Sequence, residues 1–373
     1  MSIYTTPLQF GYFMALLFAV LFWIRGSREE RLADTLMGWL MLLLNQMLQD
    51  YTFGFAGINV LWNELHGFPR GAGLLLGPAV YFYLRTQTNR NFKLQRKHLW
   101  HLLPWAVMFV YQLQFFLRGP LVVQAYEQSS VAEVMNAFST VLLWASLIAY
   151  FRASILLYRR YRGWIAHAYS DLDRVSLAWF RNFIYVYIAG FAFQQVMMLV
   201  DVFADWDFYQ DWWWNLALVG VVAYTAIQGY AQPQMVPLAF DDAPEPTPTD
   251  QTPAPAAPTV DSALQLSIET AMQQQQLYLE SDLTLASLAK RINAPSSAVS
   301  ATINTAFQCN FNEFVNRYRI QYFKQELARP ENQQLTLLAV AFDSGFNSKA
   351  TFNRVFKRLE GMTPKAYWDS LRG

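Results

Sequence analysis

The sequence predicts an all-α protein in two parts: a bundle of seven membrane-spanning helices over residues 1–232 and a polar helical domain over residues 261–373. The chain is 54% hydrophobic, 17% aromatic and only 15% charged, against about a quarter charged in soluble proteins. The apolar bias is local, because twelve of the thirteen tryptophans precede residue 215. From residue 261 onward, apolar residues recur instead at helical spacing among charged ones.

Seven apolar stretches are long enough to cross a bilayer, which needs about 20 helical residues. They lie near 7–24, 34–55, 69–86, 99–117, 133–151, 179–203 and 212–231. The third is the least regular, because glycines and Pro78 interrupt it. Membrane helices tolerate such residues where neighbouring helices satisfy the backbone.

The basic residues between the spans predict the orientation of the bundle, because cytoplasmic loops of membrane proteins are enriched in Lys and Arg. With the N-terminus outside, the inner loops carry thirteen basic residues, namely Arg25, Arg28, Arg31, Arg85, Arg90, Lys93, Arg96, Lys97, Arg152, Arg159, Arg160, Arg162 and Arg174. The outer segments carry only Arg70 and Arg118. An odd number of spans then places the C-terminal domain in the cytosol.

Polar residues inside the predicted spans are candidates for sensing a signal ligand, because such residues are costly in a membrane. The selected residues are Asn45, Gln49 and Asp50 in the second span and Gln194, Gln195 and Asp201 in the sixth. The loop after the sixth span adds Asp205, Asp207 and Asp211, followed by three tryptophans. The alternative is that these side chains hydrogen-bond between helices and form an interfacial aromatic belt.

The spans show no sign of catalysis or metal binding. They contain no nucleophile elbow, phosphate loop or metalloprotease motif, and the four histidines lack metal-ligand spacing. The sequence therefore predicts neither an enzyme nor a metal or cofactor site.

Residues 233–260 change character abruptly and predict a linker. They contain eight prolines and four acidic residues without a basic one. Such a segment cannot bury a core, so it is expected to be extended and mobile. A mobile tether transmits torque poorly, so a signal from the membrane domain is expected to change the dimerisation, local concentration or release of the DNA-binding domain. The alternative is that the linker is a passive spacer.

The C-terminal domain is predicted to contain two helix-turn-helix units joined by a long helix. After a first helix around residues 264–272, Thr284 is expected to cap the next helix, and the following helix runs from Pro295 or Ser296 to Phe307. A longer helix covers residues 312–327. The second unit begins near Thr336, turns at Gly345, and continues from a Ser348 cap into a helix that ends at Gly361.

The stretch AFDSGFNSKATFNRVFKRLEGMTPKAYW carries the most specific signal in the chain. Together with the helical pattern of residues 261–373, it resembles the DNA-binding domain of the AraC/XylS family. The resemblance implies a transcription regulator whose two recognition helices enter successive major grooves of double-stranded DNA. By position, it assigns DNA contacts to Ser297, Ser300, Ala301, Lys349, Ala350, Asn353 and Arg354.

The two predicted recognition helices differ in charge. The second adds Lys357 and Arg358 to its outer face, whereas residues 293–307 contain no Lys or Arg. Asn304 is therefore the best remaining hydrogen-bonding candidate of the first recognition helix. The sequence also departs from the family pattern at Gln308, where the family commonly has a turn glycine. Residues 283–373 hold twelve basic and six acidic residues, as DNA binding requires, although the whole chain has a net charge of +1.

These patterns predict a one-component transcription regulator, embedded by several spans in the bacterial cytoplasmic membrane and binding promoter DNA as a homodimer. Its expected partners are DNA, the lipid bilayer and an unknown signal ligand. Two alternatives stay open: a transporter or enzyme with a helix-turn-helix regulatory module, or a regulator whose spans serve only as an anchor.

Overall fold

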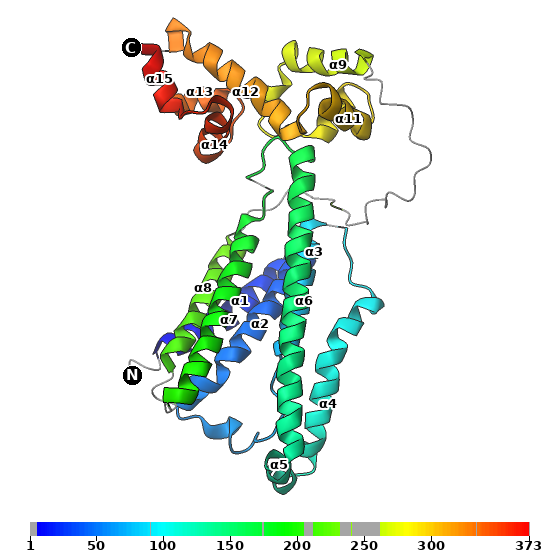
Figure 1. The fold of residues 1–373 in the computed structure, drawn as a ribbon, viewed down its shortest axis with the longest axis vertical. Coiled ribbons are helices and arrows are strands. Elements are labelled where there is room, and N and C mark those ends of the chain that lie inside the picture. Colours follow the sequence, from blue (N-terminus) through cyan, green and yellow to red (C-terminus); the bar gives the residue numbers. More distant parts are fainter. Residues whose placement is uncertain are drawn as a thin grey trace. The chain divides into compact units, whose positions relative to one another are not determined.

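The computed structural model describes residues 6–89, 91–173, 175–204, 212–231, 240, 262–332 and 334–372 (Figure 1). Within these ranges the chain is helical and contains no strand, although Tyr169 and Thr284 form an isolated bridge, so the predicted all-α class is confirmed. The chain forms two compact units. The first unit comprises Met1–Tyr158 and Leu177–Asp241, and the second comprises Arg159–Ser176 and Asp242–Gly373.

The first unit is built from apolar helices of different lengths. They are α1 (Thr6–Arg28), α2 (Leu32–Phe55), α3 (Gly73–Thr88), α4 (Leu103–Leu117), α5 (Pro120–Glu127), α6 (Ser130–Ala168), α7 (Ala178–Ala204) and α8 (Leu216–Tyr230), with short 3₁₀ turns η1 (Asn59–Leu61), η2 (Arg96–Leu102) and η3 (Trp212–Asn215). Helix α1 packs against α2 and α8, and α8 also packs against α7 (Figure 1). Exposed side chains on α1, α4, α6 and α7 include many large apolar ones, as expected of surfaces that face lipid.

Three helices in the described part of the chain are long and apolar enough to cross a membrane: Thr6–Arg28, Ser130–Ala168 and Ala178–Asp201. Helix α8 is apolar but shorter. The third and fourth predicted spans correspond to α3 and α4, which have 16 and 15 residues. At 1.5 Å per residue these two helices are shorter than the roughly 30 Å hydrocarbon core. The count of seven spans stays a prediction.

One end of the first unit is held together by a largely buried ion pair. The Arg25 guanidinium, in the last turn of α1, donates to both carboxylate oxygens of Asp34 on α2, from Nε and Nη2 at 2.8 Å each. Its Nη1 donates to the backbone oxygen of Tyr230 at the end of α8, also at 2.8 Å. The Arg25 side chain therefore brings the end of α1, the start of α2 and the end of α8 to the same end of the unit.

Helix α6 differs from its sequence prediction. The fifth span was expected to end at residue 151 and to be followed by an inner loop, but the helix continues to Ala168. The prediction was wrong because the arginines after residue 151 were interpreted as loop residues. Arg is a good helix former, and this polar continuation contains no proline, so the helix runs on through Gly163 to Ala168. The residues of α6 from Arg159 onward belong to the second unit.

From Ser262 onward, the second unit contains the helices expected from the sequence and one further helix, α15. They are α9 (Ser262–Gln273), α10 (Leu285–Arg291), α11 (Ser296–Ala306), α12 (Phe311–Leu327), α13 (Leu337–Asp343), α14 (Lys349–Glu360) and α15 (Pro364–Arg372), with 3₁₀ turns η4 (Leu277–Leu279) and η5 (Pro330–Asn332). One core forms around α9, α10, α11 and the first half of α12. A second core forms around the rest of α12 with α13 and α14. Helix α12 therefore joins two helix-turn-helix units.

The ends of these helices follow from their terminal residues. The side-chain oxygens of Thr284, Thr336 and Ser348 each accept a hydrogen bond from a backbone N–H in the first turn of α10, α13 and α14, respectively. Gly361 ends α14 with a left-handed φ of 75°. Gln308 has a left-handed φ of 55°, which explains why a glycine would suit this turn. Its side-chain Nε2 donates to the Thr305 backbone oxygen at 2.6 Å and holds the turn in place.

Gly345, in the turn of the second helix-turn-helix unit, is expected to tolerate no side chain. Its φ is 88°, and a Cβ there would lie 2.5 Å from the Tyr278 carbonyl oxygen and 3.0 Å from that of Leu279. We expect Gly345→Ala to destabilise the second unit by about 3 kcal/mol, because backbone strain and overlap with rigid backbone add together. Gly361→Ala is the matched control. It has a similar φ but open space around the added Cβ, and its expected cost is about 1 kcal/mol. Thermal unfolding of both variants, together with amide hydrogen exchange in α12–α14, measures the difference in stability between them. Equal losses of stability would contradict the predicted overlap at Gly345.

Candidate nucleic-acid interface

Helix α11 presents a small polar face. Ser297, Ala301 and Asn304 are exposed and Ser300 is half-buried, while Val299 and Ile303 point into the first core. The four predicted contact residues recur at intervals of three and four and therefore share one helical face. This face can offer hydroxyl and amide groups for hydrogen bonds, but it carries no positive charge.

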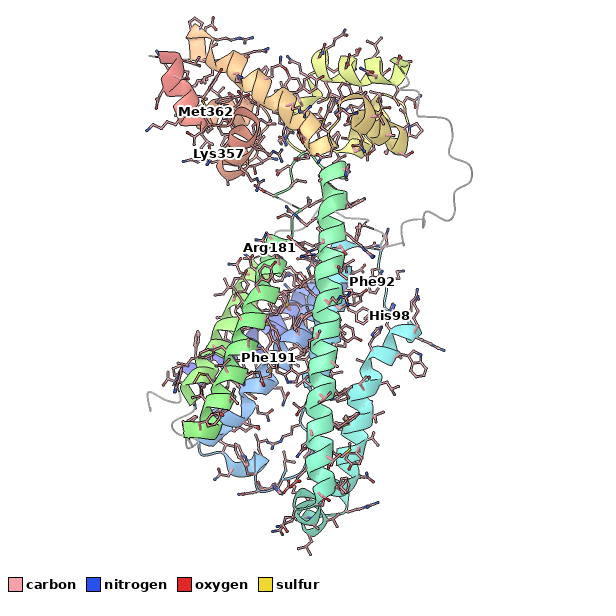
Figure 2. The ribbon with its side chains drawn as sticks, viewed as in Figure 1. Phe92, His98, Arg181, Phe191, Lys357 and Met362 are labelled. Carbon is pink, nitrogen blue, oxygen red and sulfur yellow. The ribbon has the colours of Figure 1, made fainter. Side chains whose placement is uncertain are left out.

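Helix α14 presents a basic face. The six predicted contact residues on it are all exposed, namely Lys349, Ala350, Asn353, Arg354, Lys357 and Arg358. Thr351, Phe352, Val355 and Phe356 are buried on the opposite side, and Figure 2 shows Lys357 on this helix. The segregation follows from the apolar stripe, which packs against Phe323 of α12, with 4.7 Å between the ring centroids of Phe323 and Phe352. The exposed face therefore carries four cations and one amide, the kinds of groups that bind phosphates and base edges.

The segment Tyr169–Asp173, which follows α6, packs against the helix-turn-helix units and is here called the docking segment. The Ser170 hydroxyl is buried and donates to the Leu283 backbone oxygen at 2.6 Å. The Ser170 backbone oxygen accepts from the amide of Asn312 on α12, also at 2.6 Å. All these atoms belong to the second unit.

Arg319 of α12 completes the anchor of the docking segment. Its side chain is 1% exposed and donates to the backbone oxygens of Tyr278 at 2.7 Å and Glu280 at 2.8 Å, and to the Ser170 hydroxyl at 3.2 Å. Burial lowers the pKa of Arg319 to about 10, although the carboxylates of Asp171 and Asp282 favour the charged form. The guanidinium therefore stays positively charged at neutral pH and joins three separate stretches of backbone.

The docking segment reaches the start of α14 through two carboxylates. Asp171 accepts from the Asn347 amide at 2.9 Å, just before the helix. Asp173 accepts from Nη2 of Arg354 at 2.8 Å, from the Ser348 hydroxyl at 3.5 Å and from the Thr351 hydroxyl. Partial burial tends to raise the pKa of Asp173, but the hydrogen bonds from Thr351 and Arg354 outweigh it, so the pKa lies below its usual value. Asp173 is therefore ionised at neutral pH.

Sequence reasoning missed the docking segment because it treated residues 152–178 only as a carrier of basic residues. The signal that could have found it is the pair Asp171 and Asp173, two acidic residues in a loop that the orientation rule expects to be basic. That rule counts Lys and Arg and gives Asp and Glu little weight.

The predicted sensing residues lie on α2 and α7. Asp50 is exposed and forms an ion pair with Arg70 at 3.2 Å, whereas Asn45 is buried and its Oδ1 has no hydrogen-bond partner in the described structure. Gln49 and Gln195 are half-buried, and so is Asp201. The neighbouring Gln46 accepts from the Ala72 backbone N–H at 3.3 Å, which matches the alternative of hydrogen bonding between helices.

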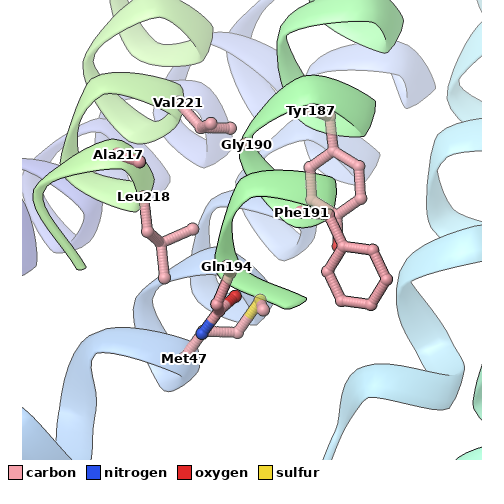
Figure 3. A pocket seen from close by; sticks show the side chains of 8 residues that line it. All are labelled: Met47, Tyr187, Gly190, Phe191, Gln194, Ala217, Leu218 and Val221. Atoms are coloured by element: carbon pink, nitrogen blue, oxygen red, sulfur yellow. The ribbon is translucent and has the colours of Figure 1, made fainter. Parts of the chain in front are cut away.

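Of the six predicted sensing residues, Gln194 lines a cavity between α2, α7 and α8 (Figure 3). Met47, Tyr187, Phe191 and Leu218 contribute to its wall. Its volume of about 10 Å³ is room for roughly one water molecule, whereas ligand pockets usually measure about 300 Å³ or more. The cavity brings Gln194 close to α2 without gathering Asn45, Gln49 or Asp50 around it.

Two predicted features fall largely outside the described residues. The acidic loop at Asp205, Asp207 and Asp211 is one, and the linker at 233–260 is the other, except for Phe240. Phe240 is buried, and its backbone N–H donates to the Thr88 oxygen at the end of α3 at 3.2 Å. This contact ties the chain after α8 to the first unit.

Comparison with known proteins supports the helix-turn-helix assignment. Residues 288–370 match the family model described as a helix-turn-helix domain. An uncharacterized HTH-type transcriptional regulator of Staphylococcus aureus strain COL is 30% identical over 92 residues, which are 25% of this chain and 12% of that protein. Proteins with the same description from strains MSSA476 and N315 match with the same identity and coverage.

The similarity covers a restricted part of each protein. The chain spans about an eighth of the length of these curated relatives, and the residues that match the family model, 288–370, lie within the second unit. No solved structure matches the chain. The comparisons therefore identify a helix-turn-helix domain of the kind found in transcription regulators, and they say nothing about the first unit.

Proposed function

We propose that this protein is a membrane-embedded transcription regulator, in which the second unit binds promoter DNA in the cytoplasm and the first unit spans the cytoplasmic membrane. The observation that carries the proposal is the exposed basic face of α14 within a matched helix-turn-helix domain. In such domains the second helix of a motif enters the major groove, where Lys and Arg bind phosphates and guanine edges.

The arrangement of the first unit supports a cytoplasmic position for the DNA-binding domain. Arg25 joins the end of α1 to the end of α8, and Phe240 joins the chain after α8 to the end of α3. The basic loops that mark the inner side follow α1 and α3. The chain therefore leaves α8 on the side that the positive charges assign to the cytoplasm.

Chromatin immunoprecipitation of the full-length protein from its native host tests this proposal. We expect discrete peaks at promoters, which disappear in the variant Lys349→Ala with Asn353→Ala. The matched control is Lys365→Ala on α15, which removes a cation from the same domain outside both recognition helices. A wild-type protein without peaks, or peaks that persist unchanged in the α14 variant, would contradict the proposal.

We propose further that the first unit senses a signal rather than serving only as an anchor. The support is the set of polar residues on α2 and α7, of which Asn45 is buried and its oxygen has no hydrogen-bond partner among the residues that the structure describes. Replacing the predicted spans with an unrelated single span that enters with its N-terminus outside separates the two roles. A sensor loses its response to growth conditions in this replacement, whereas an anchor keeps the same transcriptional output.

A further inference from the structure

We propose that the docking segment, Tyr169–Asp173, is an autoinhibitory element that occupies the DNA-facing surface of α14 and must leave it before DNA binds. The inference rests on the proposed DNA-binding function and names how that function is regulated. Its basis is that Asp173 binds three residues at the start of the recognition helix, including Arg354, which is itself predicted to contact DNA.

The Asp173 carboxylate resembles a DNA phosphate in its charge and in the groups that bind it. It accepts from a guanidinium and two hydroxyls at the N-terminus of α14, where the helix dipole also favours an anion. A phosphate of the DNA backbone would use the same donors. One donor set cannot satisfy both anions at full strength, so Asp173 and DNA compete.

The strength of the contacts suits a reversible element. The Arg354 side chain is 60% exposed and that of Asp173 is 35% exposed, and ion pairs in such positions contribute little because water and salt screen them. The firm attachment lies away from α14, at buried Ser170 with Arg319 and Asn312. The acidic tip can therefore leave α14 while the rest of the segment stays anchored.

The docking segment also gives the first unit a covalent route to the recognition helix. It follows directly after Ala168, where α6 ends, and the earlier part of α6 is apolar and long enough to span a membrane. The Tyr161 hydroxyl on α6 donates to the Val175 backbone oxygen, which folds the connection back onto the helix. A signal that shifts the end of α6 would act on Asp173 without passing through the Pro-rich linker.

The test measures affinity of the full-length protein, in lipid nanodiscs, for a promoter fragment recovered by the chromatin immunoprecipitation described above. We expect Asp173→Asn to bind this fragment about 5- to 10-fold more tightly, because the competing charge is lost. The control is Asp343→Asn, which removes an exposed carboxylate from α13 of the same helix-turn-helix motif. Among the described residues, no hydrogen bond or ion pair joins the Asp343 carboxylate to α14 as Asp173 is joined. This control variant is expected to change affinity by less than about twofold, as a general charge effect would.

A second measurement needs no variant. Amide hydrogen exchange at the acidic tip, Asp171–Asp173, in the wild-type protein is expected to accelerate on addition of the promoter fragment, because DNA displaces the tip, whereas exchange at the anchored Ser170 stays slow. The proposal would be overturned if Asp173→Asn bound DNA no more tightly than the wild type, or if Asp173→Asn and Asp343→Asn gained affinity equally. It would also be overturned if amide hydrogen exchange in the docking segment did not change when DNA binds. If neither the wild type nor Asp173→Asn binds the fragment, the proposed DNA-binding function itself fails, and the inference fails with it.

Discussion

Alanine at both Lys349 and Asn353 of α14 is expected to weaken promoter binding by the full-length protein about 100-fold, whereas alanine at both Ser297 and Asn304 of α11 weakens it by less than about tenfold. The reason is the difference in charge between the two faces. Lys349 can bind a phosphate or a guanine edge and Asn353 an adenine edge, and each such contact contributes about 1–3 kcal/mol. The face of α11 offers neutral groups alone.

Fluorescence anisotropy with a labelled promoter fragment measures both variants at several salt concentrations. Loss of Lys349 is expected to reduce the salt dependence of binding by about one released counterion, whereas the α11 variant keeps the wild-type slope. Amide hydrogen exchange across α10–α14 serves as the folding control. Equal losses of affinity from the two helices would show that α11 contributes as much to binding as α14.

Replacing Arg319 by methionine is expected to lower the free energy of unfolding of the second unit by about 3 kcal/mol or more. Methionine fills much of the volume of the arginine but leaves the backbone oxygens of Tyr278 and Glu280 without their donor. Buried acceptors that lose a charged donor cost about 1–3 kcal/mol each. The change also removes the bond to Ser170, so the docking segment is expected to be held less firmly, by Asn312 and Leu283.

Arg317→Met on the same helix is the matched control. The Arg317 side chain is 48% exposed and pairs with Glu313 four residues earlier, an interaction worth a few tenths of a kcal/mol. Differential scanning calorimetry of the full-length protein in nanodiscs, with hydrogen exchange to assign the transition to the second unit, compares the two variants. A similar loss of stability in both would refute the role of Arg319 as a buried connection.

Local signals were sufficient to predict the helices of the two helix-turn-helix units. Thr284 and Ser348 cap helices where the sequence placed caps, and Gly345 and Gly361 have positive φ at the turn and the helix end that the sequence placed there. Each of these features depends on residues within a few positions along the chain. The exposed face of α14 followed from the same helical periodicity, since the buried stripe determines which residues remain outside.

Interactions between residues far apart in the chain determined the features that local patterns could not predict. The sequence by itself determined the all-α class, the helix-turn-helix units and the basic face of α14, because caps, turns and periodicity act over one or two helical turns. The tertiary structure alone decided that Asp50 pairs with Arg70 and that Asp173 meets Arg354, 181 residues later in the chain. No short-range pattern specifies which partner a polar side chain will find, because folding selects that partner by bringing buried donors and acceptors together.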